Sequence, residues 1–309
     1  MKRNVCIFIK KYKAVRKTTI IILSLLYAFS CNTNQQKNIN PNGTEANSSI
    51  MNDQKLVEKI FYNVPSPLEM AKLAKDAGMI FNPELTNPIE NKQLYIDQTS
   101  QALNLGVYGA DLSYARIFDQ VQESVNFLSV IRELTDQLQI PQDEKTMNLD
   151  LMEKYINNRD SLLHVITKMY GEVDIYLKEN NRSMIAVMII SGGWVEGNYL
   201  ALSTMNIDNP NKKILERIGE QKYSLESLIK LLEPHVKEGH KSAQILNDFK
   251  ELYKIYEDVT ISTTNQGAVT DSSAGKTTLT GETTVEIDNE TLMNILDFTV
   301  GLRNKITKP

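Results

Sequence analysis

Apolar residues recur three and four positions apart through most of the chain from about residue 55, which is the spacing of one face of a helix. Runs in which apolar and polar residues alternate, as in a strand, are almost absent. The helices that this spacing predicts are residues 66–78, 87–103, 114–138, 163–177, 245–259 and 289–306. We therefore predict an all-α fold over residues 55–306, a multi-helix bundle of antiparallel helical hairpins.

The first two predicted helices begin with capping signals. Ser66 is followed by a proline and, three residues later, by Glu69, which together form a capping box with proline at the first helical position. Gly78 stands where the end of that helix needs a left-handed residue. Asn87 and Pro88 open the second helix in the same way. We expect both helices to begin at these residues.

Two of the apolar segments indicate helices with a wide buried surface. The predicted helix 114–138 has two apolar stripes side by side, so it should contact several neighbours. The segment MIAVMII (184–190) is apolar all round and is followed by Ser191, Gly192 and Gly193, where we expect the helix to break. Seven residues are too few to cross a membrane. We predict that this segment is the central helix of the bundle.

Two segments of the chain resemble each other, LGVYGADLSYA (105–115) and GGWVEGNYLA (192–201). They share two glycines four residues apart or nearly so, an aromatic residue near the first, an acid near the second, and a tyrosine close before an alanine. The similarity predicts an internal pseudo-repeat, in which two helical hairpins pack about a pseudo-twofold axis. Because glycine inside a helix costs about 1 kcal/mol relative to alanine, these glycines need an explanation.

The glycines have two explanations. One is close contact between helices, because glycine lets two backbones approach each other. The other is room for a ligand. The candidate ligand pocket would be lined by Asp111, Trp194, Glu196 and Tyr199. We favour packing and keep the pocket as the alternative.

Residues 260–286 are rich in threonine, serine and glycine. This composition predicts a long mobile loop before the final helix, and a transient hairpin within TTLTGETTVEI (277–287) is an alternative for part of it. Loops of this length are usually functional or disordered.

The first 30 residues have the three parts of a signal peptide. Residues 1–17 carry seven basic side chains and no acid, residues 18–29 form a short apolar core, and the small residue Ser30 precedes Cys31. Twelve helical residues rise about 18 Å, well short of the roughly 30 Å hydrocarbon core of a bilayer. The pattern resembles the signal peptide and lipobox of bacterial lipoproteins, in the style found in Bacteroidetes.

This resemblance implies that residues 1–30 are removed and that the thiol of Cys31 carries a lipid that anchors the protein to a bacterial membrane. Residues 31–54 would then be the lipidated cysteine and a flexible tether, because the stretch is polar and has no apolar periodicity. Acidic clusters mark surface export in some lipoproteins of this kind, and none closely follows Cys31. We therefore expect an outer-membrane protein that faces the periplasm. Ordinary secretion with a free cysteine is the alternative.

The charge of the chain limits its partners. Without residues 1–30, the protein has 27 basic and 38 acidic residues and a net charge of −11. An acidic protein repels nucleic acid and anionic headgroups, so we expect no nucleic-acid partner and membrane association through the lipid on Cys31. The other cysteine, Cys6, lies in the segment to be removed, so no disulfide framework is expected.

The three histidines form no catalytic or metal-binding motif. His164, His235 and His240 belong neither to an H-E-x-x-H sequence nor to the Glu-x-x-His pair of di-iron bundles. The cluster HVKEGH (235–240) could offer two imidazoles to a metal, but its glycine and the preceding proline indicate a solvated turn. We expect no metal and no cofactor.

Two functions from different classes remain. The first is a lipid-anchored envelope protein whose helical domain binds an envelope protein or a small molecule, or has a structural role, without catalysis. The second is an envelope enzyme or metal-binding protein that uses carboxylates converging inside the bundle. The carboxylates considered are Asp111, Glu123, Glu172 and Glu196. We prefer the first, because no nucleophile or histidine arrangement accompanies these acids. Buried, clustered carboxylates near Trp194 would favour the second.

Overall fold

Helices make up most of the described chain, as the hydrophobic spacing predicts. The computed structural model describes residues 67–309 apart from 77, 144–145, 208, 237 and 272–275, and for residues 263–283 only the backbone is described. These residues belong to one unit that spans 49–309. The predicted signal peptide, Cys31 and the tether lie outside the described residues. The all-α, multi-helix fold is confirmed.

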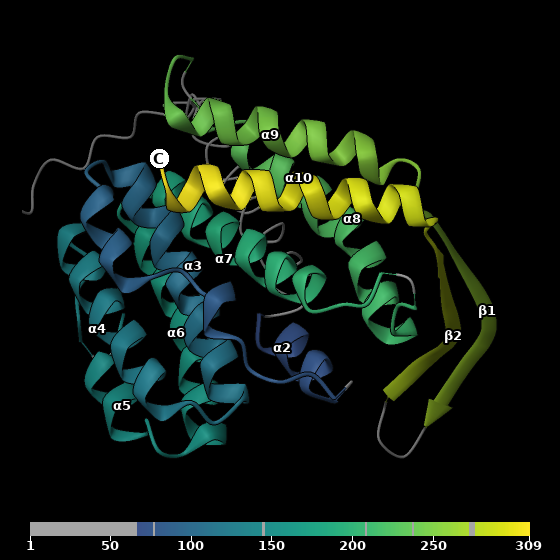
Figure 1. The fold of residues 1–309 in the computed structure, drawn as a ribbon, viewed down its shortest axis with the longest axis horizontal. Helices are drawn as coiled ribbons and strands as arrows, with labels where there is room; N and C mark the ends of the chain where they lie inside the picture. The colour runs from purple at the N-terminus through teal and green to yellow at the C-terminus, as the bar shows by residue number, and fades with distance from the viewer. Residues whose placement is uncertain (1–66, 77, 144–145, 208, 237, 272–275) are drawn as a thin grey trace, which may run out of the picture. The chain divides into compact units, whose positions relative to one another are not determined.

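The elements are few enough to follow in order along the ribbon (Figure 1). They are α2 (Pro67–Asp76), η1 (Pro83–Leu85), η2 (Ile89–Leu94), α3 (Gln98–Ile117), α4 (Val121–Gln137), α5 (Leu149–Lys154), α6 (Arg159–Glu179), α7 (Ser183–Ser203), α8 (Lys212–Leu232), α9 (Lys241–Tyr256), β1 (Thr260–Asp271), β2 (Lys276–Glu286) and α10 (Asn289–Thr307). Gly78 follows α2 with a φ of +86°, the left-handed conformation that the sequence predicts there.

Helix α7 is the central helix, as predicted. It packs against α2, α3, α6, α8 and α10. Within the described part of the chain, it is long and apolar enough to cross a membrane by length and composition, but 89% of the apolar window is buried inside the protein. Core burial therefore accounts for its hydrophobicity. The predicted break at 191–193 is wrong, because the helix continues for 21 residues through both glycines and is held by its neighbours on each side.

The predicted helix 114–138 is two helices. Helix α3 ends at Ile117 and α4 begins at Val121, and between them Asp119 has a φ of +61°. The amide of Gln120 donates to the carbonyl of Ala115 at 2.8 Å, which closes the end of α3. The apolar spacing continues across this turn because both helices face the same core, so the sequence pattern alone does not reveal the turn.

Two further boundaries differ from the prediction. Residues 89–94 form the 3-10 helix η2, and α3 begins only at Gln98, where the carboxylate of Asp97 accepts the amide of Ser100 at 2.9 Å. The α-helix therefore does not begin at Asn87. Helix α8 (212–232) is not among the predicted helices, although it buries nine of its 21 residues.

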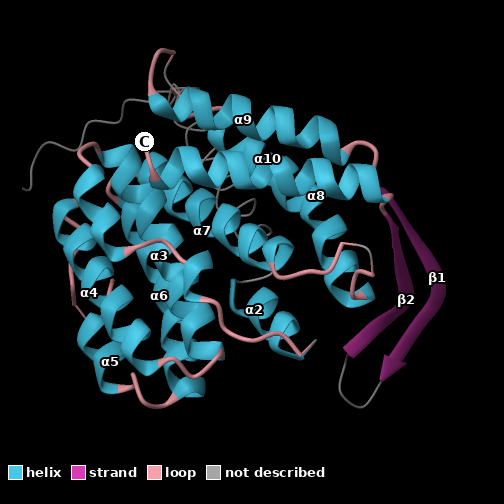
Figure 2. Ribbon diagram, in the orientation of Figure 1, coloured by secondary structure: helices cyan, strands magenta, loops and turns pink. Residues whose placement is uncertain are grey.

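The segment 260–286 contains strands instead of the predicted long loop. Strands β1 and β2 pair antiparallel from Thr260 with Glu286 to Asp271 with Lys276, with an irregularity between Asn265 and Gly267 (Figure 2). Threonine and valine are β-branched and favour extended backbone, which accounts for strands in a segment of this composition. The base of the hairpin packs on α8, where Val285 is buried.

Candidate functional site

Helices α3 and α7 touch backbone to backbone, and glycines make this contact. A Cβ atom on Gly192 would overlap the carbonyl oxygen of Leu103, and one on Gly106 would overlap the carbonyl oxygen of Ile189. On Gly193 a Cβ atom would lie 3.3 Å from the carbonyl oxygen of Gly106. Both similar segments therefore meet at one helix crossing, and the packing explanation accounts for Gly106 and Gly192.

This crossing brings two acids together in the core. Asp111 of α3 and Glu196 of α7 are each 0% exposed. The guanidinium of Arg303, from α10, binds Glu196 with two bonds, Nε to Oε2 at 3.0 Å and Nη2 to Oε1 at 3.1 Å. Paired bonds of this kind are among the strongest polar contacts in proteins. Glu196 is therefore a carboxylate whose charge is balanced inside the protein.

The surroundings of the second acid of the pair, Asp111, favour its protonated form. Its Oδ2 accepts the backbone amide of Asn87 at 3.1 Å, and its Oδ1 has no N–H or O–H donor among the described residues. Burial, together with the negative charge of Glu196, raises the pKa of Asp111 well above its usual range. Burial also raises the pKa of Glu196, although Arg303 opposes this. A protonated Asp111 can donate to the carboxylate of Glu196, and the pair then holds one proton and forms a group of no net charge with Arg303.

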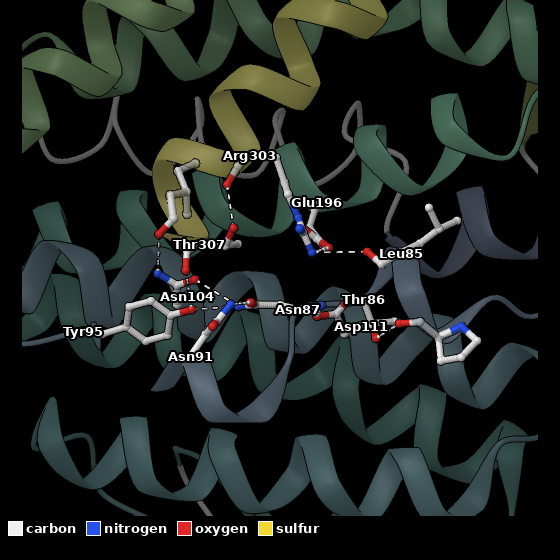
Figure 3. A network of polar contacts seen from close by, with 12 residues as sticks. Leu85, Thr86, Asn87, Asn91, Tyr95, Asn104, Asp111, Glu196, Arg303 and Thr307 are labelled. Carbon is white, nitrogen blue, oxygen red and sulfur yellow. Dashed lines mark hydrogen bonds and ion pairs between the residues drawn. The ribbon is translucent and has the colours of Figure 1, made fainter. Parts of the chain in front are cut away.

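Side-chain amides extend this group into a buried polar network (Figure 3). The Nδ2 of Asn87 donates to the hydroxyl of Tyr95 at 2.9 Å and to Oδ1 of Asn104 at 3.3 Å. The Tyr95 hydroxyl donates to the carbonyl oxygen of Thr307 at 3.2 Å, and Nδ2 of Asn104 donates to that of Ile306 at 2.9 Å. The network thus ties the irregular segment between α2 and α3 to the last turn of α10.

Three of the four residues of the sequence-predicted pocket meet here and one does not. Asp111 and Glu196 form the carboxyl pair, and the ring of Tyr199 stacks on the guanidinium of Arg303 at 4.6 Å. Trp194 lies on the opposite side of α7, since two residues turn a helix by about 200°. Its indole Nε1 donates to Gln221 of α8 at 2.9 Å, and its ring packs edge-on against Phe249 of α9.

The other acids considered for catalysis do not join the pair. Glu123 is half-buried on α4 and accepts from Asn126 at 3.5 Å, and Glu172 is half-buried on α6 and pairs with Lys168 at 3.3 Å. His164 is exposed on α6. Within the described ranges, no group of three or more histidine, cysteine, aspartate or glutamate side chains is placed to hold a metal ion.

The histidine cluster at 235–240 lies in the turn between α8 and α9. His235 is half-buried, while Glu238 and His240 are exposed to solvent. Gly239 has a φ of +80°, a conformation that breaks a helix. The turn predicted from the sequence is therefore present, and the side chains of Glu238 and His240 face water.

The shared proton predicts a pH dependence of stability. The unfolded Asp111 carboxyl, with a pKa of 3.8, loses its proton near pH 4, whereas the folded protein retains it to a higher pH. The folded state then binds more protons, so the stability that Asp111 contributes should fall as the pH rises above about 4. Asp111→Asn can still donate to Glu196 but does not titrate. Urea unfolding from pH 5 to pH 8 should show a smaller loss of stability in this variant than in wild type; parallel curves would contradict the shared proton.

Groups of the protein itself, the backbone amide of Asn87 and the guanidinium of Arg303, bind the two carboxyls. Both acids are removed from solvent, Glu196 is neutralised by Arg303, and burial raises the pKa of Asp111 and so favours its protonated form. The chain matches no family model, and no curated protein and no solved structure matches it.

Proposed function

We propose that the protein is a lipid-anchored protein of the bacterial cell envelope, whose helical domain has a binding or structural role without catalysis. The anchor is supported by the basic segment, short apolar core and Cys31 in that order, and by the polar tether after it. The proposed place is the outer membrane, with the domain facing the periplasm. The net charge of −11 without residues 1–30 argues against a nucleic-acid partner.

One observation supports a non-catalytic role for the domain. The acids that catalysis would use, Asp111 and Glu196, are both 0% exposed and are engaged by Asn87 and Arg303. A general acid or base must come within hydrogen-bond distance of its substrate, and these two face their own core. The alternative, an envelope enzyme or metal-binding protein, draws support from the burial and pairing of the two acids. Their engagement with the core and the position of Trp194 favour the first proposal.

Replacing Cys31 with Ala tests the anchor. In a bacterial host fed a labelled fatty acid, wild type is expected to be labelled and to fractionate with membranes, because the thiol forms the bond to the lipid. Cys31→Ala should lose the label and leave the membrane fraction. Cys6→Ala is the matched control, since Cys6 lies in the segment that would be removed. A labelled, membrane-bound Cys31→Ala protein would exclude this anchor.

A further inference from the structure

Arg116, in the last turn of α3, is a buried cation without a hydrogen-bonding partner. Only 2% of its surface is exposed, and its Nε and Nη1 atoms are covered and donate to no acceptor among the described residues. The third nitrogen, Nη2, also donates to none of them, but it is not covered, so a molecule in solvent can touch the guanidinium there. Leaving a buried charged group unpaired is among the costliest polar defects in a folded protein, so this arginine calls for an explanation.

The packing of α3 against α6 places Arg116 near the start of α6. The two helices run antiparallel, because Gly109 lies against the Tyr170 hydroxyl while Nη1 of Arg159 lies 3.9 Å from Oδ2 of Asp119. Arg116 is seven residues after Gly109, about 10.5 Å along the helix axis, and the same rise back from Tyr170 ends about one turn from the start of α6. Burial lowers the pKa of Arg116; Asp119 opposes this shift and Arg159 adds to it, so both lie close enough to act on the guanidinium.

The start of α6 is itself a place that favours an anion. The N-terminal end of a helix carries a partial positive charge and its first amides have no partner within the helix. The side chain of the cap residue Asn158 accepts the amide of Ser161 at 3.0 Å. The amides of Arg159 and Asp160 donate to no acceptor that the described part of the chain supplies. A positive helix end and an unpaired guanidinium therefore lie side by side.

The acids nearby are bound to other cations. Oδ2 of Asp119 accepts from Lys75 at 3.0 Å and lies 3.9 Å from Arg159. The exposed carboxylate of Asp160 lies 3.1 Å from Nε of Arg159. The carbonyl end of α3 also favours a cation, but Lys75 already donates to it. Three cations thus share two carboxylates, and the charge of Arg116 is the one left without a bonded acid.

We propose that an oxyanion, the phosphate or carboxylate group of a small molecule, binds between Arg116 and the N-terminal turn of α6. Its oxygens accept hydrogen bonds from Nη2 of Arg116 and from the amides of Arg159 and Asp160, and its negative charge balances the buried guanidinium. Arginine side chains and helix N-termini are both common binding groups for such anions. This inference deepens the proposed binding role of the helical domain and rests on it, but it does not depend on the lipid anchor.

The test is a titration of the 15N-labelled protein, observed by NMR at pH 7. The probes are sodium phosphate and sodium acetate, with sodium chloride at equal ionic strength as the control. Phosphate, acetate or both should shift the amide signals of Arg159 and Asp160 and the Nε signal of Arg116 in a saturable way, and the probe that does so identifies the preferred group. Chloride should not reproduce these shifts. If neither phosphate nor acetate gives a saturable shift at these three signals, the site does not exist.

Variants test the role of the arginine. Arg116→Met keeps a long side chain and removes the charge, so its affinity for the bound probe should fall about tenfold or more. Arg132→Met, a cation on α4 that pairs with Asp150 and Glu153, is the control and should bind as wild type does. Wild-type affinity in Arg116→Met would overturn the assignment.

A second variant keeps the test decisive if Arg116→Met does not fold. The side chain of Arg159 is 42% exposed, so Arg159→Met should leave the fold intact. Its affinity for the same probe should fall about threefold, because one of the positive charges beside the anion is lost; an unchanged affinity would contradict the site. Failure of these titrations leaves the Cys31 labelling result intact, so the two proposals fail separately.

Discussion

Replacing Arg303 with Met is expected to lower the free energy of unfolding by about 3–5 kcal/mol, because it leaves a buried carboxylate without its cation. Arg303 is 5% exposed and donates two hydrogen bonds to Glu196, which is 0% exposed, and a third to the carbonyl oxygen of Leu85. Glu196 would then have to take up a proton or draw water into the core, because the negative charge of the carboxyl pair would no longer be balanced by the guanidinium. Urea denaturation followed by circular dichroism measures the loss.

A control on the same helix separates the ion pair from a general effect on α10. Lys305 pairs with Asp248 at 2.7 Å, but its side chain is 63% exposed. Lys305→Met should therefore cost no more than about 1 kcal/mol. Combining Arg303→Met with Glu196→Gln should recover part of the loss, since the uncompensated charge is removed. If Arg303→Met costs no more than Lys305→Met, the buried ion pair is not what holds α10 in place.

Replacing Gly192 with Ala is expected to destabilise the domain by about 1–3 kcal/mol or more, as overpacking of a core does. The added methyl group would overlap the backbone carbonyl of Leu103, and a backbone atom can give way only if α3 moves. Such a shift would also separate Asp111 from Glu196. A thermal melt beside wild type measures the effect.

Gly171→Ala is the matched control for this change. Gly171 also lies inside a helix, α6, but a methyl group there would meet no atom within 4 Å. It should raise stability by up to about 1 kcal/mol, because alanine favours the helix more than glycine does. The two glycine variants are thus expected to change stability in opposite directions. If Gly192→Ala has the melting temperature of wild type, the alternative explanation, that this glycine makes room for a ligand, would be favoured.

Hydrophobic spacing was sufficient to predict the fold class and several helices. Residues 163–177, 245–259 and 289–306 lie within or near α6, α9 and α10 because each has one apolar face. The same signal concealed the turn at Asp119, where the spacing continues although the chain reverses. It also missed the strands at 260–286, since a threonine-rich hairpin does not alternate between apolar and polar residues. The composition of this segment is typical of a loop, but its β-branched threonine and valine residues favour the extended backbone of strands.

The candidate site was predicted only in part. Asp111 and Glu196 stood out because each lies beside glycines in a similar segment, and the two segments do meet. Arg303 did not stand out, because it is 107 residues from Glu196 and nothing in the local sequence distinguishes it from other arginines. Trp194 belongs to the candidate pocket because it is close to Glu196 in the sequence, but two residues along a helix place its side chain on the side of α7 opposite to Glu196. Pairings between distant helices depend on packing, which periodicity does not encode.

The attachment of α10 also has a consequence for the order of events during synthesis. Asn104 and Tyr95 bond to carbonyls 202 and 212 residues later in the chain, and Arg303 lies 107 residues after Glu196. A chain still emerging from the ribosome therefore holds Asp111 and Glu196 without their cation until residue 303 has been made. Contacts this distant in sequence form late during folding. A product that stops before residue 303 should consequently remain open, expose apolar surface and be degraded, so that mainly chains that include α10 persist in the cell.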